Sequence, residues 1–491
     1  MGAKRVVVIG GGIAGLAAAY RVKKLVPGVE LTLVETERRL GGKILTDRVD
    51  GFVVEGGPDT FVSYKPAGIG LCRELGIEDR LHGTNKQVRG SFVMRKGRLY
   101  EMPEGLTGLI PSKFGPMATT GLISPLGKLR MGLDLFVPAK RDGEDETLAE
   151  FVRRRLGGEL YERLIEPLMS GIYAGDGEEL SLGATFPQLR QSELEHGSLV
   201  AGMFATKKKN REAARKAAEA EKAARAATNL AMAAGTPLPA RKQWPAFVTP
   251  ETGLAEIVEA LAKTFEAKEL LLGTKARRVE RLGAEWVVEI EGGEALRCDA
   301  LVLATPSHGA APLVRGIDSA MADALAAIPH ASTATLTVAY RESDLPKPLN
   351  AYGYVIPKRE GRAVLATTWT STKFPHRAPA GYVLIRSFIG RAGNDAGIQL
   401  SDEELLRMVK EEQRDVLGIT AEPLLYRLFR WPLAMPQYTK GHLGRLSTIE
   451  GRTSAWPGLA LAGNAYRGIG LPDCIASGEG AAKSVASYLA N

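Results

Sequence analysis

The sequence predicts an α/β protein whose main parallel sheet is assembled from separate segments of the chain. Residues 5–9 form an apolar, β-branched run, and the alanine-rich residues 16–20 that follow are strong helix formers. Residues 30–35 have the pattern of a second parallel strand. Much later, residues 300–306 and 458–463 are again apolar enough for buried strands. This pattern indicates that the chain returns to its first sheet.

Size and composition favour two or three domains, because 491 residues at 45% hydrophobic content exceed what one core usually holds. Three cysteines, Cys72, Cys298 and Cys474, are too few and too scattered for a disulfide framework or a zinc site. We therefore expect core thiols and a reducing compartment. No apolar run approaches the roughly 18 residues of a spanning helix, so the cytoplasm is the expected location.

The net charge of +8 favours anionic partners such as a polycarboxylate, a nucleic acid or an acidic lipid surface. Residues 207–227 hold eight basic and three acidic side chains among alanines, which indicates a solvated helix or arm. No aromatic platform accompanies this charge, so we expect no nucleic-acid partner.

The turn after the first strand carries the glycine spacing of a Rossmann dinucleotide site. Gly10, Gly12 and Gly15 fit GxGxxG between a strand and a helix, and Glu35 lies twenty residues beyond the last glycine. The first glycine permits the tight turn, the second lets a pyrophosphate approach the backbone, and the third allows close packing of helix on strand. Glu35 would bind a ribose hydroxyl. The alternative is a glycine-rich turn without a ligand.

Further glycines favour FAD over NAD as the dinucleotide. The segments 38–43 (RRLGGK) and 55–58 (EGGP) bring more backbone close to a long, extended ligand. Near the C-terminus, the glycine-rich turn 463–475 precedes a helix predicted from about 475 to 489. The N-terminus of that helix could face the flavin ring and stabilise negative charge on its reduced form, with Asp473 either taking part or serving as an ordinary helix cap.

The remaining patterns predict a discontinuous arrangement of domains. Strands expected near 333–340, 352–356 and 383–388 suit a second, mixed-sheet domain for substrate. The predicted divisions are 1–62, 244–308 and 446–491 for the FAD-binding domain, 63–90 and 309–445 for the substrate-binding domain, 91–206 for a helical domain, and 207–243 for a charged helical arm or linker.

Within the helical domain, residues 100–138 are apolar but interrupted by prolines, which gives short amphipathic pieces such as 129–136. Two interpretations stay open. These pieces pack into their own domain, or they make a peripheral contact with the inner face of the membrane.

Narrower motifs resemble the protoporphyrinogen oxidase family, within the flavin amine-oxidase-like superfamily. They are residues 166–175 (EPLMSGIYAG), 435–438 (MPQY) with Gly441-His442, and 472–475 (PDCI). The resemblance extends from residue 4 to the C-terminus, interrupted mainly by 207–243. Residues 368–370 (TWT) and 374–376 (FPH) resemble the Gram-positive branch, which is known for oxidising coproporphyrinogen III to coproporphyrin III.

The resemblance implies two sets of contacts. Those to FAD are Gly10, Gly11, Gly12, Ile13, Ala14, Gly15, Glu35, Thr36, Lys43, Gly57, Pro58, Asp59, Thr60, Ala276 through its backbone, Trp431, Ile469, Gly470 and Leu471. Those to the tetrapyrrole are Gly171 and Ile172, with Tyr352, Val355 and Trp369 lining the pocket. Mitochondrial and plastid relatives carry an arginine for a substrate propionate where this chain has Ser91. Lys65, which matches a lysine of the Gram-positive group, is the expected carboxylate partner, and the alternative is an exposed surface lysine.

The expected chemistry is hydride transfer from a porphyrinogen to FAD, followed by reoxidation by oxygen with release of hydrogen peroxide, in three two-electron rounds. Pyrrole nitrogens help to expel hydride, so no strong protein base is needed and catalysis would depend on positioning. The six histidines show no metal-ligand spacing, so we expect no metal. We expect structural roles for His308, His376 and His442.

Three alternatives remain at this stage. The substrate could be protoporphyrinogen IX. An amine or carotenoid oxidase would share the glycine motifs but not those at 166–175 and 472–475. A flavin-free binding protein like the Rab-escort proteins would keep the architecture, although the intact glycine turn and Glu35 argue against it. The sequence sets no oligomeric state.

Overall fold

The computed structural model describes residues 2–107, 110–111, 114–209, 212, 215, 244–394 and 396–491. A five-stranded parallel sheet has the order β12-β2-β1-β16-β22. Its strands are β1 (Arg5–Ile9), β2 (Glu30–Glu35), β12 (Leu270–Leu272), β16 (Ala300–Leu303) and β22 (Leu459–Leu461). The expected return of the chain to its first sheet is confirmed, and so is the Rossmann-like fold class.

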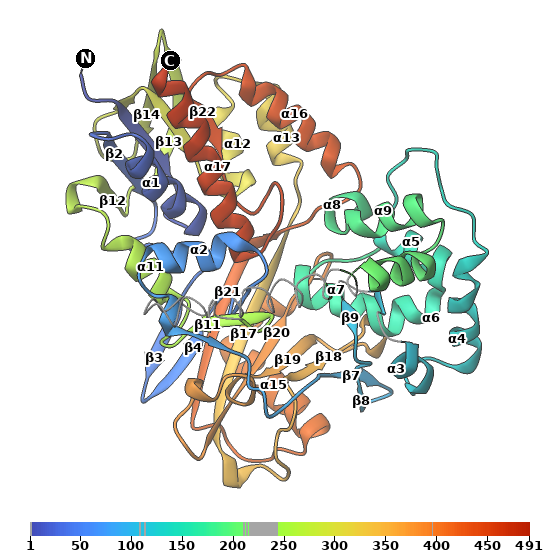
Figure 1. The fold of residues 1–491 in the computed structure, drawn as a ribbon. Coiled ribbons are helices and arrows are strands. Elements are labelled where there is room, and N and C mark those ends of the chain that lie inside the picture. Colours follow the sequence, from blue (N-terminus) through green and yellow to red (C-terminus); the bar gives the residue numbers. More distant parts are fainter. Residues whose placement is uncertain are drawn as a thin grey trace, which may run out of the picture.

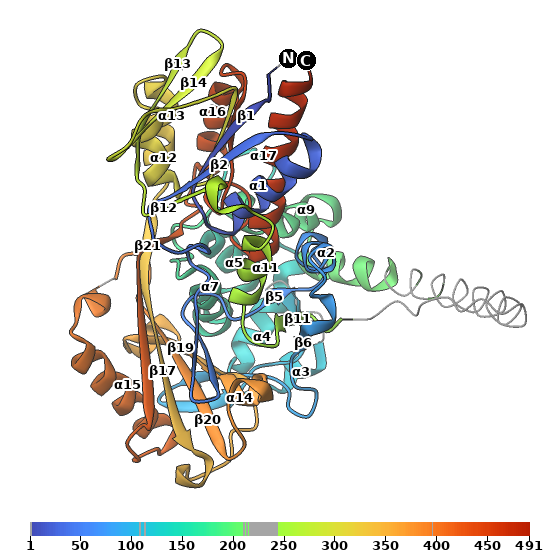
Figure 2. The same ribbon diagram turned by 90° about the vertical axis from the view of Figure 1, so that its left-hand side faces the viewer.

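Helices cover one face of this sheet, and a smaller sheet with further helices covers the other. α1 (Ile13–Leu25) and α17 (Leu471–Ala490) lie side by side, close to both chain ends (Figure 2). Their backbones approach so closely that a Cβ on Gly478 would lie 2.1 Å from the carbonyl oxygen of Ala14. The opposite face is covered by β13 (Ala276–Leu282), β14 (Glu285–Ile290), β15 (Leu296–Cys298), α12 (Ser307–Val314), α13 (Ser319–Ala326) and α16 (His442–Ser454).

A seven-stranded mixed sheet forms the second main body (Figure 1). Its order is β21 (Leu425–Pro436), β17 (His330–Arg341), β20 (Tyr382–Ile389), β19 (Val364–Trp369), β18 (Gly353–Val355), β7 (Phe92–Arg95) and β8 (Arg98–Glu101). Only β18 and β7 pair in parallel within this sheet. The predicted helical domain 91–206 therefore begins with two strands of this sheet.

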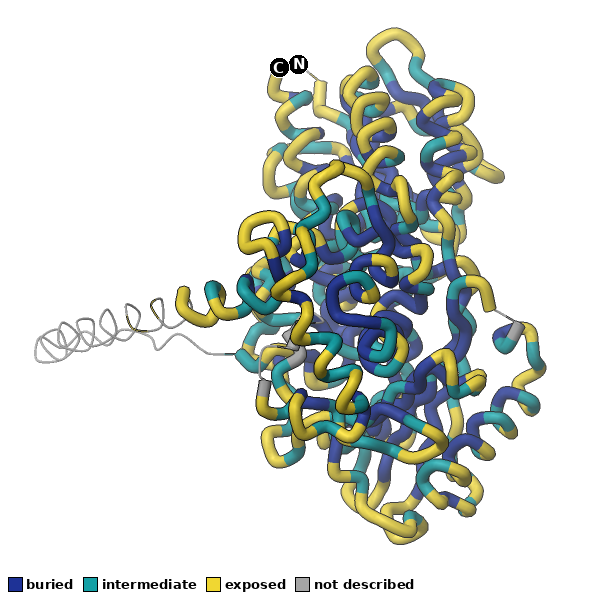
Figure 3. Tube along the Cα trace, turned by 90° about the vertical axis from the view of Figure 1, so that its right-hand side faces the viewer, coloured by how far each residue is buried: buried dark blue, intermediate teal, exposed yellow. Residues whose placement is uncertain are grey.

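Short helices lie beside the mixed sheet (Figure 1). They are α3 (Phe114–Thr119), α4 (Pro125–Gly132), η2 (Leu133–Leu135), α5 (Leu148–Leu156), α6 (Gly158–Leu160), η3 (Tyr161–Ile165), α7 (Glu166–Tyr173), α8 (Leu182–Thr185) and α9 (Pro187–His196). Burial along the chain is uneven here (Figure 3). Leu122 and Ile123 are buried, whereas α4 has no buried residue.

The remaining elements connect these bodies. They are β3 (Thr46–Val49), β4 (Phe52–Glu55), β5 (Phe61–Val62), α2 (Pro66–Glu74), η1 (Glu78–Arg80), β6 (Leu81–Gly83), β9 (Leu106–Thr107), β10 (Ile110–Pro111), β11 (Phe247–Pro250), α11 (Ala255–Ala262), η4 (Ala267–Glu269), η5 (Glu342–Asp344), η6 (Lys358–Glu360), α14 (Thr370–Lys373), η7 (Pro375–Arg377), η8 (Ala396–Gln399) and α15 (Asp402–Leu417). Of the predicted arm 207–243, all but residues 207–209, 212 and 215 lies outside the described residues. In the described part of the chain, no helix is long and apolar enough to cross a bilayer.

Candidate functional site

In the glycine turn after β1, two of the three motif glycines have no room for a side chain, whereas the remaining one has room. Gly10 has φ +110°, and a Cβ there would lie 2.8 Å from the carbonyl oxygen of Ala304. A Cβ on Gly15 would lie 1.8 Å from the carbonyl oxygen of Gly10. A Cβ on Gly12, in contrast, would meet no atom within 4 Å. The first and third glycines are therefore required by the fold, whereas the second leaves space beside the backbone, as a pyrophosphate requires.

The N-terminus of α1 is suited to an anion. Gly12 is its N-cap and supplies no side-chain hydrogen bond to the first turn, so the amide groups there are available to a phosphate. Glu35 lies at the end of β2, and its Oε2 accepts a hydrogen bond of 2.6 Å from the N–H of Gly11. Its Oε1 accepts one of 2.8 Å from the N–H of Glu37. A carboxylate has about four acceptor positions, so both oxygens can still bind ribose hydroxyls.

The first glycine pair packs directly on this turn. The N–H of Gly41 donates to the carbonyl oxygen of Gly11 at 2.8 Å, and a Cβ on Gly42 would lie 3.1 Å from the Cα of Gly12. Lys43 follows, and its Nζ donates to the carbonyl oxygen of Ala434. Burial lowers the pKa of Lys43 from 10.5 to about 8. The segment thus places a buried amine close to the anion-binding turn.

The second glycine pair is held by the mixed sheet. The carbonyl oxygen of Gly56 accepts hydrogen bonds from Trp431 Nε1 at 2.8 Å, Thr335 Oγ1 at 2.9 Å and Arg386 Nη2 at 3.3 Å. Arg386 also donates to the carbonyl oxygen of Gly57. The Nε and Nη1 of this buried guanidinium have no hydrogen-bond partner, and burial lowers its pKa. The segment expected to contact FAD therefore rests on a buried positive charge.

Asp59 belongs to the same buried charge cluster. Burial acts to raise its pKa, but Lys373 and Arg386 outweigh that effect and lower it. Lys373 Nζ lies 3.3 Å from Asp59 Oδ2. Asp59 is therefore anionic at neutral pH, and it offsets part of the cationic charge below Gly56.

The turn before α17 differs from its prediction in one respect. The helix begins at Leu471 rather than near 475, and its N-cap is Gly470. Asp473 therefore lies inside the first turn, where it accepts a hydrogen bond of 3.2 Å from the N–H of Gly470. Both of its carboxylate oxygens lie 2.7 Å from Lys65 Nζ. Asp473 thus stabilises the helix start from within the first turn, because it satisfies the N–H of the N-cap residue.

The residues expected to contact the tetrapyrrole come from neighbouring elements. A Cβ on Gly171, in α7, would lie 3.9 Å from Cγ1 of Val355 in β18. Gly171 and Ile172 are exposed, whereas Trp369 is buried. The N–H of Trp369 donates to the carbonyl oxygen of Tyr352 at 2.9 Å. The predicted site residues on α7, β18 and β19, with Tyr352 just before β18, thus lie in one region.

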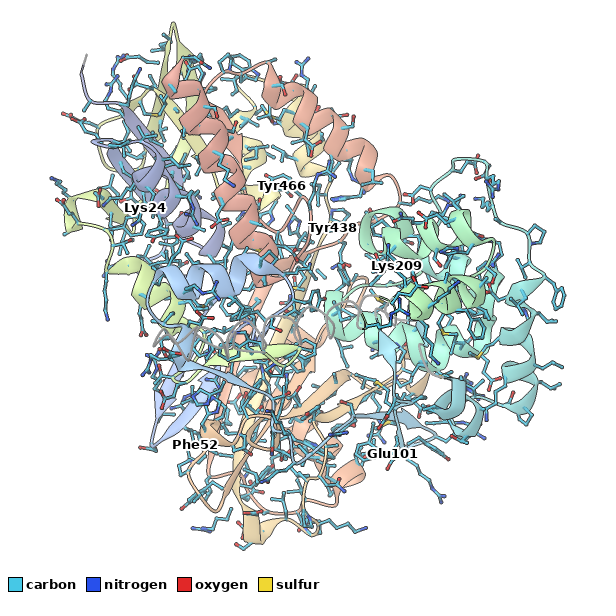
Figure 4. All side chains as sticks on the ribbon, viewed as in Figure 1. Lys24, Phe52, Glu101, Lys209, Tyr438 and Tyr466 are labelled. Atoms are coloured by element: carbon cyan, nitrogen blue, oxygen red, sulfur yellow. The ribbon has the colours of Figure 1, made fainter. Side chains whose placement is uncertain are left out.

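A packed group of side chains connects α7 with the glycine turn near the C-terminus. Tyr438 lies 6.3 Å from Tyr173 between ring centroids, and its hydroxyl donates to the carbonyl oxygen of Asn464 at 2.6 Å. Figure 4 shows Tyr438 between α17 and the helical domain. Ile469 and Val355 both pack against the hydrophobic cluster that contains Tyr173 and Tyr438. The predicted flavin turn and the predicted substrate wall therefore share one apolar core.

Three residues expected to be structural are packed against other rings. His442 stacks on Tyr438 at 4.2 Å, His376 lies 4.5 Å from His82, and His308 lies 4.7 Å from His330. All three cysteines are buried free thiols, as expected. Within the described ranges, no three His, Cys, Asp or Glu side chains are grouped so as to hold a metal ion.

Sequence reasoning did not identify Arg386, Thr335 or the partner of Lys65. Arg386 had a usable signal, because it is the one charged residue in the run 383–388, which is otherwise apolar except for Ser387. Thr335 and the pairing of Lys65 with Asp473 had none, because they depend on contacts between segments hundreds of residues apart.

An open, anion-binding glycine turn, a carboxylate at the end of the second strand and two further glycine pairs define a flavin-binding oxidoreductase fold, and these residues fit FAD. The family model for flavin containing amine oxidoreductase matches residues 13–486. The chain belongs to this family.

A coproporphyrinogen III oxidase of Bacillus subtilis (strain 168) is 37% identical over 99% of both chains. One from Propionibacterium freudenreichii subsp. freudenreichii is 37% identical over 98% of this chain and 90% of its own. A crystal structure from Exiguobacterium sp. 255-15, described as a candidate protoporphyrinogen oxidase, has a TM-score of 0.83 at 31% identity and 99% coverage of both chains.

Membership identifies the chain as an FAD-dependent oxidoreductase and excludes the flavin-free alternative. The individual FAD contacts of Ile13, Ala14, Thr36, Pro58, Thr60 and Ala276 stay predictions, as do those of the other residues named above.

Proposed function

We propose that this protein oxidises coproporphyrinogen III to coproporphyrin III, with FAD as cofactor and oxygen as electron acceptor, in haem biosynthesis. Six electrons and six protons leave the substrate in three rounds, and each round converts one oxygen molecule to hydrogen peroxide. The observation that carries the proposal is that the similarity to relatives of that activity extends over the whole chain, the substrate region included, rather than over the flavin-binding segments alone.

FAD supplies the hydride acceptor at the isoalloxazine ring. The protein contributes position. The N-terminus of α17, with its first amide groups and helix dipole, would face the ring through the turn at 469–471. Gly171 and Val355 would hold an apolar macrocycle on the opposite side, where the absence of a Cβ on Gly171 lets a flat ring approach. Lys65 would receive a propionate.

A purified preparation tests the proposal. The protein should be yellow, and its specificity constants for coproporphyrinogen III and protoporphyrinogen IX should be compared by porphyrin fluorescence under air. We expect the higher constant for coproporphyrinogen III. A higher constant for protoporphyrinogen IX would identify that compound as the preferred substrate instead. If the protein oxidised neither compound, the proposed function would be refuted.

We also propose a peripheral contact between residues 125–136, which include α4 and η2, and an anionic membrane surface. Leu126, Leu129 and Phe136 are 78%, 66% and 79% exposed, and Lys128 lies between the two leucines in the sequence. Apolar side chains flanked by basic ones bind lipid headgroup regions. The L126S/L129S/F136S variant should lose flotation with vesicles that contain phosphatidylglycerol, whereas L424S, which removes a distant exposed leucine, should not. Equal flotation of both variants would refute the contact.

A further inference from the structure

Lys65 is already paired in the protein without substrate. Its Nζ lies 2.7 Å from each carboxylate oxygen of Asp473, so one ammonium faces both acceptors at once. The Lys65 side chain is 41% exposed and that of Asp473 is 18% exposed. Lys65 is also the N-cap residue of α2, and Asp473 lies in the first turn of α17. The pair therefore joins the starts of two helices at a partly open position.

The position of Asp473 is fixed by its surroundings. Gly468 has φ +95°, and a Cβ there would lie 2.5 Å from Cγ of Asp473. Oδ2 of Asp473 accepts the N–H of Gly470. α2 and α17 are in close contact, since a Cβ on Gly68 would lie 3.2 Å from Cγ of Pro472. The carboxylate is thus built into the turn that precedes α17, whereas Lys65 reaches it on a flexible stem.

The turn that holds this carboxylate also adjoins the predicted substrate wall. Burial raises the pKa of Tyr173 to about 12, and the negative charge of Asp473 adds to this rise. Tyr173 follows Gly171 and Ile172 in α7. Ile469, between the two glycines that contact Asp473, packs against the hydrophobic cluster that contains Tyr173. The ion pair therefore lies beside the turn predicted to contact FAD, and that turn adjoins the predicted tetrapyrrole wall. A carboxylate that arrives at Lys65 would meet Asp473 as well.

We propose that Asp473 is a specificity-determining residue that competes with the substrate carboxylate for Lys65. The inference rests on the proposed function, since it requires a carboxylate-bearing tetrapyrrole at Lys65. In the free protein, Asp473 neutralises the ammonium. When substrate binds, its propionate shares Lys65 with Asp473 or displaces Asp473 from it. The free energy that this displacement requires lowers the affinity for substrate. Asp473 thereby limits how tightly an anionic porphyrin is held, which favours release of the product.

Removal of the charge of Asp473 tests the competition. Asp473→Asn keeps an oxygen acceptor for the N–H of Gly470 but no longer neutralises Lys65. The dissociation constant of coproporphyrin III, measured by fluorescence titration of the FAD-loaded protein without turnover, should fall about three- to tenfold at low salt. The gain should shrink at high salt, because the new attraction is partly exposed to solvent. Loss of structure alone would not tighten binding.

Two controls isolate the pair. Glu479→Gln removes an equal charge from the same helix, where Glu479 pairs with Arg21, and should leave the dissociation constant unchanged. In the background of Lys65→Met, Asp473→Asn should give a clearly smaller gain, because only the direct repulsion between Asp473 and the porphyrin carboxylate is then removed. If wild type binds and oxidises its porphyrinogen but Asp473→Asn binds coproporphyrin III equally or more weakly, the competition is refuted. If wild type binds no coproporphyrin III, the proposed function itself fails.

Discussion

The indole Nε1 of Trp431 donates a hydrogen bond of 2.8 Å to the carbonyl oxygen of Gly56. Trp431 belongs to β21 in the mixed sheet, whereas Gly56 follows β4 and leads into the segment expected to contact FAD. Because the indole Nε1 is used in this bond, the Trp431 side chain would contact a flavin through the apolar face of its ring. The mixed sheet is therefore joined to the turn after the β3–β4 hairpin, at residues that would hold the cofactor.

Trp431→Phe should weaken flavin retention. The variant leaves a carbonyl acceptor with one donor fewer, at a cost of about 1 kcal/mol of unfolding free energy. Chemical denaturation would give this cost, and the fraction of FAD kept after gel filtration would give the retention. Trp286→Phe is the matched control, since Trp286 Nε1 also donates to a backbone carbonyl, that of Pro457, at 3.2 Å. Trp286→Phe should lower the free energy of unfolding and leave the FAD retained per folded molecule unchanged. If both variants lost FAD equally, the predicted contact between Trp431 and FAD would be contradicted.

Gly12→Val and Gly15→Ala should fail in different ways. Space beside Gly12 lets the variant fold, but its side chain would block the pyrophosphate, so we expect a folded, colourless protein. Gly15→Ala forces a methyl group onto the carbonyl oxygen of Gly10, which should cost roughly 3 kcal/mol of stability. Circular dichroism and flavin absorbance separate the outcomes. A normally flavinylated Gly12→Val protein would move the phosphates elsewhere.

The elements of the Rossmann unit were predictable because their signals are local. The run 5–9, the glycine turn and strand 30–35 have the apolar period and spacing that a buried βαβ unit requires. The return of residues 300–303 and 459–461 to the sheet was likewise indicated by their continuous apolar character.

The parts that could not be predicted depend on contacts between distant segments. The start of α17 was placed four residues late, because Pro472 and Gly470 were interpreted as turn residues although proline is favoured in a first helical turn. Strand 92–95 joins the mixed sheet by pairing with Tyr354 and Val355, and strand 98–101 joins it by pairing with 92–95, rather than through their own pattern. The pair of Lys65 and Asp473 spans residues with no periodic relation.

Lys65→Ala should impair a substrate with four carboxylates more than one with two. The variant removes the ammonium near α17, so the KM for coproporphyrinogen III should rise more than that for protoporphyrinogen IX, while kcat changes less. Fluorescence assays of both substrates at equal ionic strength give the comparison. Lys410→Ala is a control, because this lysine pairs with Glu422 outside the predicted site. Equal increases for both substrates in Lys65→Ala would remove Lys65 from the site.

FAD affinity should depend on the charge of Lys43. Burial lowers its pKa to about 8, so without FAD the amine loses its proton as the pH rises from 7 to 9. An anionic pyrophosphate bound at the neighbouring turn would favour the protonated form and raise the pKa again. Binding above pH 8 must therefore take up a proton, and affinity falls as pH rises. The stability of the protein without FAD depends on pH in the opposite direction. Because the pKa of Lys43 in the folded protein lies below 10.5, the contribution of Lys43 to the free energy of unfolding increases between pH 8 and 10.5.

The dissociation constant of FAD, measured by flavin fluorescence quenching, should rise about tenfold between pH 7 and pH 9, because only about a tenth of Lys43 stays protonated at the higher pH. Lys43→Arg keeps its charge throughout this range and should bind FAD with little dependence on pH. Lys43→Met should bind more weakly at pH 7 and be equally insensitive. Titration of the flavin itself is common to all three proteins and cancels in the comparison. If the FAD affinity of Lys43→Arg also fell tenfold between pH 7 and pH 9, the pH dependence would come from a group other than Lys43.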